Sequence, residues 1–185
     1  MRDLSLFDHA IEAHEAEIED LGEIATLARR DFDERDTFRF RSRVPTLEYV
    51  SLLIENTLML RTARSGRVYA GFERLSRMEA IADRYLRIAD LSERTYVFGE
   101  PDWQPPRHPN MQPIALRGDA RLAREWFVIV DAPKLHVALV AVDEVGWTAD
   151  PPERRTFRAL VTHDRRLVDS LADAAEDYID LASGA

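Results

Sequence analysis

Two continuously apolar segments on either side of a tight turn constrain the fold more than any other feature. They are WFVIV, residues 126–130, and HVALVAV, residues 136–142. Neither segment alternates between apolar and polar residues, which is typical of short strands buried on both faces in the centre of a sheet. Asp131 and Pro133 in the intervening residues favour a turn. The sequence therefore predicts an antiparallel hairpin in the middle of a sheet.

A proline-rich loop precedes this hairpin. It follows the apolar strand segment Thr95–Gly99, and residues 101–113 hold five of the nine prolines of the chain. Proline fixes the backbone angle φ and has no N–H to donate, so the segment predicts a stiff, irregular loop. In open sheets that contain parallel strands, ligands usually bind where such strands end. The proline loop is therefore a candidate ligand site.

The segment Arg67–Arg74 alternates as a strand, and Ser76 and Glu79 have the spacing of a capping box that starts a helix. A strand, a helix and the strand Thr95–Gly99 make a βαβ unit, in which the two strands are parallel and joined by a right-handed crossover. Parallel strands end at the same end of a sheet. Arg74 and Gly99 are therefore expected to lie near each other.

Weaker patterns complete the outline. Further helices are expected over Leu4–Asp20, from Thr46 to Met59 and after Asp164 as N-cap, further strands over residues 37–44, 113–116 and 155–163, and a helical turn capped by Asp119 over residues 119–125. The predicted fold is α+β (mixed α/β), with a central mixed sheet of five to six strands, one βαβ unit and a C-terminal antiparallel meander, flanked by about four helices. We expect residues 1–185 to form a single domain.

Composition excludes several classes of protein. The net charge of −9 and the pI near 5.1 argue against nucleic-acid or anionic-membrane binding, which relies on excess Lys and Arg. The absence of cysteine excludes disulfides and thiol chemistry and suits a reducing compartment. No apolar run approaches 18 residues, and the N-terminus shows no signal-type core. We therefore expect a soluble, cytoplasmic protein.

Seven residues are expected to lie together where the parallel strands end: Arg74, Ser76, Phe98, Gly99, Glu100, Asp102 and Trp103. Glycine permits close backbone approach, the carboxylates form a hydrogen-bonding rim, and the indole offers a flat apolar wall. The alternative is that Trp103 and the prolines merely cover the end of the sheet. These residues point to no particular cofactor, and no spacing of histidines favours a metal site.

Three arginines, Arg39, Arg41 and Arg43, alternate with phenylalanine or serine on one predicted strand. Such a stripe could bind a phosphate or carboxylate. More often it is a solvated strand face paired to nearby acids, which is the interpretation we favour.

Several segments resemble one known family. They are FERLSR (72–77), Arg84-Tyr85 and Ile88-Ala89 in the following helix, YVFGEPD (96–102), LAREWFVIVDAP (122–133), HVALVAVDE and TFRALVTHDRRLV. Together they resemble the DICT domain, a sensory module named for its presence in diguanylate cyclases and two-component systems. The resemblance is good over Gly66–Leu171 and looser before it. It implies a cytoplasmic, signal-input domain of α+β type that senses an unidentified cue and passes the change to a partner.

The residues and the resemblance leave three functional hypotheses open. The favoured one is a non-catalytic module that binds a small ligand or a partner protein at the proline loop and acts on a kinase, a cyclase or a transcription regulator. Because the chain contains none of these output regions itself, we expect it to act as a stand-alone module. Its amphipathic terminal helices would relay the change or contact a second copy in a homodimer. The alternatives are a structural interaction domain, or a small hydrolase or nucleotide-processing enzyme that uses Glu100, Asp102, His163 and Asp164, with or without a divalent ion.

Overall fold

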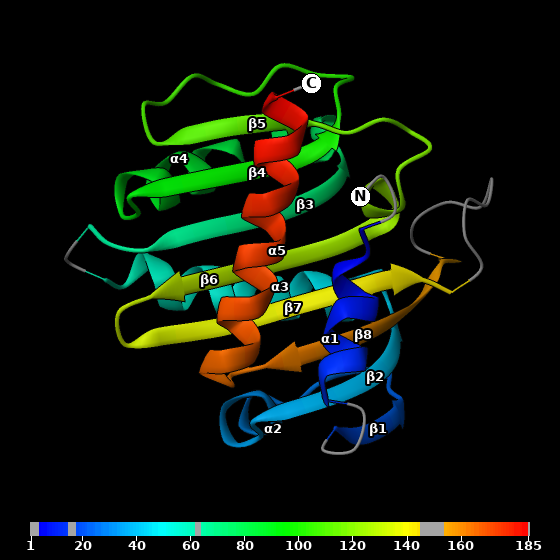
Figure 1. Ribbon diagram of the computed structural model, residues 1–185. Coiled ribbons are helices and arrows are strands. Elements are labelled where there is room, and N and C mark those ends of the chain that lie inside the picture. The colour runs from blue at the N-terminus through cyan, green and yellow to red at the C-terminus, as the bar shows by residue number, and fades with distance from the viewer. Residues whose placement is uncertain (1–3, 15–17, 62–63, 145–153, 185) are drawn as a thin grey trace.

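The computed structural model describes residues 4–14, 18–61, 64–144 and 154–184. Its eight strands form one mixed sheet in the order β1-β2-β8-β7-β6-β3-β4-β5 (Figure 1). The strands are β1 Glu19–Glu23, β2 Thr37–Arg43, β3 Arg67–Arg74, β4 Arg94–Glu100, β5 Met111–Ala115, β6 Glu125–Ala132, β7 Leu135–Asp143 and β8 Thr156–Thr162. The α-helices are α1 Leu6–His14, α2 Arg29–Glu34, α3 Val44–Met59, α4 Ala82–Asp90 and α5 Arg165–Ser183, and the 3-10 helices are η1 Leu75–Ile81 and η2 Arg121–Arg124.

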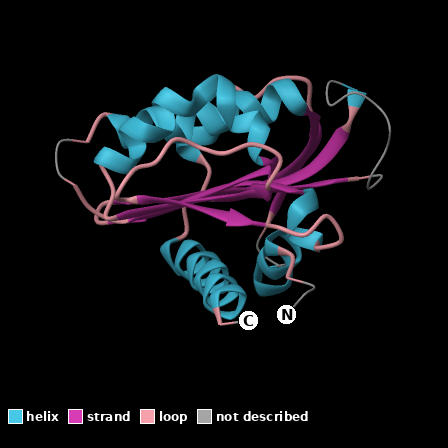
Figure 2. Ribbon diagram, turned by 90° about the horizontal axis from the view of Figure 1, so that it is seen from above, coloured by secondary structure: helices cyan, strands magenta, loops and turns pink. Residues whose placement is uncertain are grey.

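Helices cover both faces of the sheet (Figure 2). On one face α2, α3 and α4 pack over a core that includes Phe40, Leu47 and Tyr85, and on the other face α1 and α5 pack over a core that includes Phe127 and Leu171. The predicted mixed α/β fold is therefore confirmed.

The hairpin at the centre of the sheet is also confirmed. Strands β6 and β7 pair antiparallel, with Ala132 opposite Leu135, so that Pro133 and Lys134 alone make the turn. Successive residues of β6 point to opposite cores: Phe127 contributes to the α1 and α5 side, and the next residue, Val128, to the other. Burying one such side chain contributes about 1.5–3 kcal/mol, which explains why both runs are apolar except at His136, next to the turn.

The sheet is larger than predicted. The first helix ends at His14, and residues Glu19–Glu23, which were expected to lie at its end or beyond it, form β1 instead. This strand pairs parallel with β2 at the edge of the sheet, and its residues are mostly exposed. An exposed edge strand has no apolar face and therefore leaves little periodic signal in the sequence. The segment predicted at 113–116 becomes β5, which pairs parallel with β4 at the other edge.

The predicted capping box of Ser76 and Glu79 does not form. Strands β3 and β4 are parallel, as predicted, but the connection begins with the 3-10 helix η1, and no side chain caps its start. The reason is that Ser76 donates its backbone N–H and its hydroxyl to Asp102 in the proline loop. Asp119 likewise does not cap the predicted turn, because η2 begins after Ala120. By contrast, the Asp164 side chain accepts from the N–H of Arg166 at the start of α5, as predicted.

The pairing directions place the loops at two opposite ends of the strands. Strands β3, β4 and β7 finish at the same end, where the proline loop begins, and we call it the proline-loop end. Strands β6 and β8 run the other way and finish at the opposite end, where Pro133 and Lys134 turn. We call this the hairpin-turn end.

Candidate functional site at the proline-loop end

The ends of β3 and β4 lie side by side, as predicted. Arg74 is opposite Glu100 in the register of the two strands. Gly99 lies so close to the start of η1 that a Cβ atom on it would be 2.8 Å from the Leu75 nitrogen and 2.9 Å from the Arg74 carbonyl carbon. Only glycine allows this approach without moving backbone atoms.

Asp102 ties the proline loop to η1. Its carboxylate accepts the Ser76 N–H at 2.9 Å and the Ser76 hydroxyl at 2.6 Å, and its own N–H donates to the Glu100 carbonyl at 2.9 Å. The hydrogen bond from the Ser76 hydroxyl, assisted by the nearby charge of Arg74, lowers the pKa of Asp102 below its usual range. The loop is therefore fixed to the helix by a charged group that is itself exposed to solvent.

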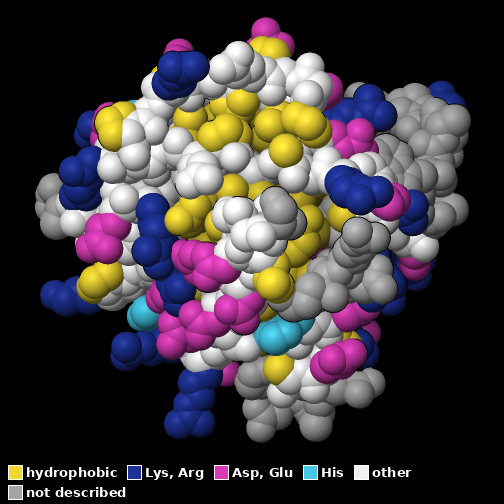
Figure 3. Space-filling view, turned by 45° about the horizontal axis from the view of Figure 1, so that its top comes forward, with side chains coloured by type: hydrophobic (Ala, Val, Ile, Leu, Met, Phe, Trp, Pro, Cys, Tyr) yellow, Lys and Arg dark blue, Asp and Glu magenta, His cyan; other side chains and the backbone are white. Residues whose placement is uncertain are grey.

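A shallow, mainly apolar hollow opens beside this anchor. It has a volume of about 460 Å³ and is lined by Leu75, Pro101, Asp102, Trp103, Gln104, Pro105, Pro113 and Ala115. Trp103 is half-buried and packs against the core under α3 and α4. Figure 3 shows hydrophobic side chains gathered on the surface that carries β5 and the loop.

A second hollow of about 490 Å³ continues along the loop and shares Gln104, Pro105 and Pro113 with the first. The proline loop therefore runs beside β5 with apolar hollows along it. Pro113 lies within β5, where proline is tolerated because β5 is an edge strand.

Of the seven predicted residues, only Asp102 and Trp103 line these hollows, and the other five do not. The Phe98 ring is fully buried on the opposite face, 5.4 Å from the Phe127 ring, and belongs to the core with α1 and α5. Glu100 points toward Gly118, where a Cβ atom would lie 3.2 Å from its carboxylate. Because side chains alternate along a strand, Phe98 belongs to the core and not to the site.

A buried charge cluster that the sequence does not predict lies next to the site. Glu73 at the end of β3 is 2% exposed, and its carboxylate accepts hydrogen bonds from Arg77 at 2.7 Å and Arg155 at 2.9 Å. Arg155 also donates to Asp143 at 2.6 Å. Glu73 has a φ of 63°. No local pattern marks this cluster, because its members come from three distant parts of the chain.

The four residues of the enzyme hypothesis do not come together. Glu100 ends β4 and Asp102 follows it at the proline-loop end, whereas His163 and Asp164 follow β8 at the hairpin-turn end. His163 contacts the Arg35 carbonyl through Nδ1 at 3.1 Å, and Asp164 serves as a helix cap. The predicted acid–base cluster is therefore wrong. Across the described residues, no three His, Asp or Glu side chains are grouped in a way that could hold a metal ion.

Two of the three arginines of the stripe on β2, Arg39 and Arg41, are paired with acids, as the interpretation we favoured predicts. Arg39 lies 3.2 Å from Asp20 on β1, and Arg41 lies 2.8 Å from Glu144. These pairs are exposed to solvent, so each contributes little to stability.

None of the helices that the structure describes combines the length and the apolar character needed to cross a bilayer.

Comparison with known proteins identifies the family. Residues 37–144 match the model of the DICT family, described as a sensory domain in diguanylate cyclases and two-component systems. No curated protein matches the chain. Strand β8 lies outside the matched residues but is inserted between β2 and β7, which lie inside them, so the structural unit extends beyond the match. Because the match covers more than half of the chain, this protein belongs to the DICT family of sensory domains.

Proposed function

We propose that the chain is a non-catalytic signal-input module that binds a small organic ligand or a partner protein in the hollows along the proline loop. The observation that carries this proposal is the attachment of the loop to η1 through Asp102 and Ser76, directly beside a hollow walled by Trp103. The sensory role follows from the family, and the placement of the site is our inference.

The lining favours a flat, largely apolar ligand. Proline rings and an indole supply most of the wall, while Asp102 and Gln104 supply polar atoms at the rim. Small-molecule sites commonly combine an apolar wall with a few polar groups in this way. A stiff loop also loses little conformational entropy when it closes on a ligand.

The signal would consist of a shift between two arrangements of the loop. In the structure, Asp102 holds the loop against η1. In the second arrangement this contact would be broken, and the loop could move away from β5. A ligand can shift this equilibrium only by its difference in affinity for the two arrangements. Ser76 lies three residues after Glu73. Breaking the contact between Asp102 and Ser76 would therefore also alter the buried cluster of Glu73 and Arg155.

The downstream partner is proposed to be a kinase, a cyclase or a transcription regulator. The terminal helices α1 and α5 lie together on one face of the sheet and are the surfaces we propose for this contact or for a homodimer.

Thermal-shift screening against nucleotides, tetrapyrroles and divalent metals tests the proposal. We expect an organic compound present at about 100 times its Kd to raise the melting temperature by roughly 5–10 °C. The shift should be lost in Trp103→Ala and reduced in Asp102→Asn. Tyr49→Ala is the matched control, because this exposed aromatic residue lies on α3 and outside the proline-loop hollows.

Two results would contradict the proposal. One is a ligand-induced shift that survives in both Trp103→Ala and Asp102→Asn. The other is stabilisation by a divalent metal that chelator reverses and that accompanies turnover of a substrate. Native mass spectrometry of the freshly purified protein would add the mass of any ligand that purifies with it and the number of subunits.

A further inference from the structure

The two hollows along the proline loop form one elongated groove, which we call the proline-loop groove. They share Gln104, Pro105 and Pro113. Ala115, the last residue of β5, lines the first hollow, and Met111, its first residue, lines the second. At about 3.3 Å per residue, β5 extends over about 13 Å, which is the length of about four residues of a polyproline II helix. The shape therefore suits an extended polypeptide segment.

The wall of the groove is mainly proline. Trp103 contributes the flat face of an indole to it. The prolines that line it are Pro101, Pro105, Pro106, Pro109 and Pro113. Proline-rich segments in the polyproline II conformation bind in grooves lined by aromatic rings, and they lose little conformational entropy because this helix is largely formed before binding.

The free edge of β5 is unsuited to an added β-strand. The carbonyl of Asn110 and the N–H of Leu116 bond to β4, so the odd-numbered residues between them direct their backbone groups away from β4. Of these, Met111 donates its N–H to a carbonyl of the proline loop at 3.1 Å, and Pro113 has no N–H. A polyproline II segment requires no ladder of backbone hydrogen bonds, so this edge does not oppose it.

Trp103 offers a hydrogen-bond donor that the protein does not use. None of the described residues accepts from its indole N–H, whereas the indole of Trp126 donates to Ser51 at 3.0 Å. The N–H of Trp103 is not buried, so an acceptor can reach it from outside. In a polyproline II segment the backbone carbonyls are free to accept such a bond.

Arg107 gives the groove an uncommitted charge. It is exposed in the second hollow, and it forms no ion pair with any residue that the structure describes. Two other titratable side chains of the groove have partners: Asp102 accepts from Ser76, and His108 lies 2.8 Å from Asp90. The uncommitted charge is therefore positive and favours an acidic residue in the bound segment.

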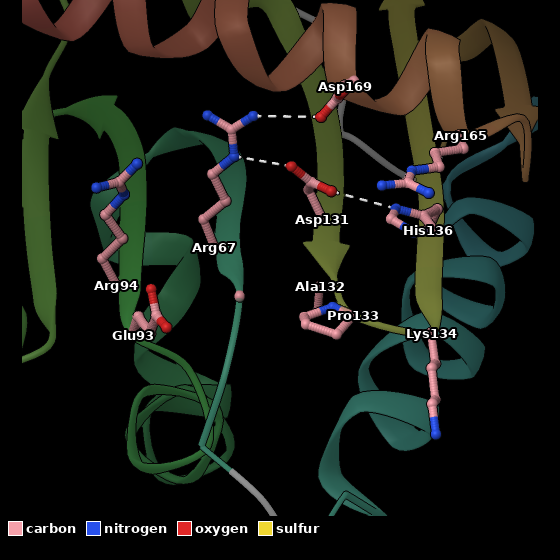
Figure 4. A pocket seen from close by; sticks show the side chains of 11 residues that line it. Arg67, Glu93, Arg94, Asp131, Ala132, Pro133, Lys134, His136, Arg165 and Asp169 are labelled. Carbon is pink, nitrogen blue, oxygen red and sulfur yellow. Dashed lines mark hydrogen bonds and ion pairs between the residues drawn. The ribbon is translucent and has the colours of Figure 1, made fainter.

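The hollow at the hairpin-turn end differs in this respect. It has a volume of about 580 Å³, but its two arginines on the sheet are already paired. Arg67 lies 2.9 Å from Asp131 and 3.5 Å from Asp169 (Figure 4), and Arg94 lies 2.9 Å from Glu176. Binding through these arginines would break existing pairs, whereas a segment in the proline-loop groove breaks none.

We infer that the proline-loop groove binds an extended, proline-rich segment of a partner protein that carries an acidic residue. Proline rings of the segment pack against the wall, a backbone carbonyl accepts from Trp103, and the carboxylate pairs with Arg107. The flat, apolar groups that the wall favours are then the proline rings. The inference rests on the proposed function and names the chemistry of the partner at that site.

Fluorescence anisotropy with labelled peptides tests the inference at constant ionic strength. The probe is a peptide of consecutive prolines with a glutamate at each end, and its controls carry lysine at both ends or alanine in place of every second proline. We expect submillimolar binding of the probe to the wild-type protein and weaker binding of both controls. The lysine peptide should bind about two- to fivefold more weakly, as an exposed ion pair allows.

Variants separate the two contacts. Trp103→Ala should weaken binding of the probe about tenfold or more, and Trp103→Phe, which keeps a ring but has no N–H, should weaken it less. Arg107→Gln should abolish the preference for glutamate over lysine. Arg87→Gln is the matched control, because it removes an exposed charge on α4, outside both hollows. In NMR spectra the indole resonance of Trp103 should shift on addition of the probe, and that of Trp126 should not.

Three outcomes would overturn the inference. The first is binding of the probe that survives in Trp103→Ala and leaves the Trp103 resonance unmoved. The second is equal affinity of the wild-type protein for the glutamate and lysine peptides. The third is the absence of peptide binding while an organic compound still gives a thermal shift that is lost in Trp103→Ala, which would leave the proposed function intact. Absence of both responses would refute the proposed function as well.

Discussion

Arg155 donates two hydrogen bonds to the carboxylate of Glu73, at 2.9 and 3.4 Å, although the residues are 82 positions apart in the chain. Both side chains are nearly inaccessible to solvent. Glu73 has a left-handed backbone conformation at the irregular end of β3, and this turn directs the chain into η1, which begins two residues later. The pair therefore fixes the part of the chain from which Ser76 reaches the proline loop.

Replacing Arg155 with glutamine should destabilise the protein by about 3–5 kcal/mol, because Glu73 and Asp143 would remain buried without their shared cation. Urea unfolding measures the change in the free energy of unfolding. Arg155→Lys keeps the charge but not the paired donors, so an intermediate loss is expected. Arg154→Gln, at the neighbouring exposed position, should change stability by less than about 0.5 kcal/mol. Equal losses at both positions would show that the buried pair is unimportant.

Replacing Gly99 with alanine should separate the end of β4 from η1. The added methyl group would meet backbone atoms of Arg74 and Leu75 at 2.8–2.9 Å, and these atoms cannot rotate away. We expect a loss of about 1–3 kcal/mol and faster amide hydrogen exchange at Ser76. In Gly118→Ala the methyl group would meet only the mobile end of Glu100, at 3.2 Å, so its exchange pattern should resemble the wild type. Unchanged protection of Ser76 in Gly99→Ala would argue against the coupling of strand and loop.

The attachment of α1 to the sheet should depend on pH. The buried carboxyl group of Glu125, at the start of β6, accepts from the Ser5 hydroxyl and from the N–H groups of Leu6, at 2.9 Å, and Phe7, at 3.4 Å. Burial raises the pKa of Glu125 from 4.5 to about 7, and these hydrogen bonds only partly oppose the shift. The folded protein therefore holds the proton more tightly than the unfolded chain.

This difference stabilises the fold fully below the unfolded pKa, and the stabilisation is lost as the pH rises toward 7. Between pH 4.5 and 7 the free energy of unfolding should fall by up to about 3 kcal/mol through Glu125. In Glu125→Gln this part of the pH dependence should disappear, whereas Glu48→Gln, at an exposed position on α3, should keep it. Chemical denaturation at several pH values provides the measurement, and parallel curves for the wild type and Glu125→Gln would contradict the expectation.

Local patterns in the sequence predicted the elements in which buried residues recur in a regular or continuous pattern. The apolar runs at 126–130 and 136–142 identified the central hairpin, because a strand covered on both faces needs apolar residues at nearly every position. The parallel pairing of β3 and β4 followed from their connection, and it placed Arg74 beside the Gly99 turn. The cap at Asp164 was also predictable, since it requires only neighbouring residues.

Tertiary structure alone decided the contacts between distant segments. Insertion of β8 between β2 and β7 brings Arg155 to Glu73, and the order of strands in a sheet leaves no mark on the local sequence. The same long-range contacts redirected Ser76 from a helix cap to Asp102 and separated His163 from Glu100. Periodicity reports whether a residue is buried, whereas its partners depend on which elements the complete sheet places beside it.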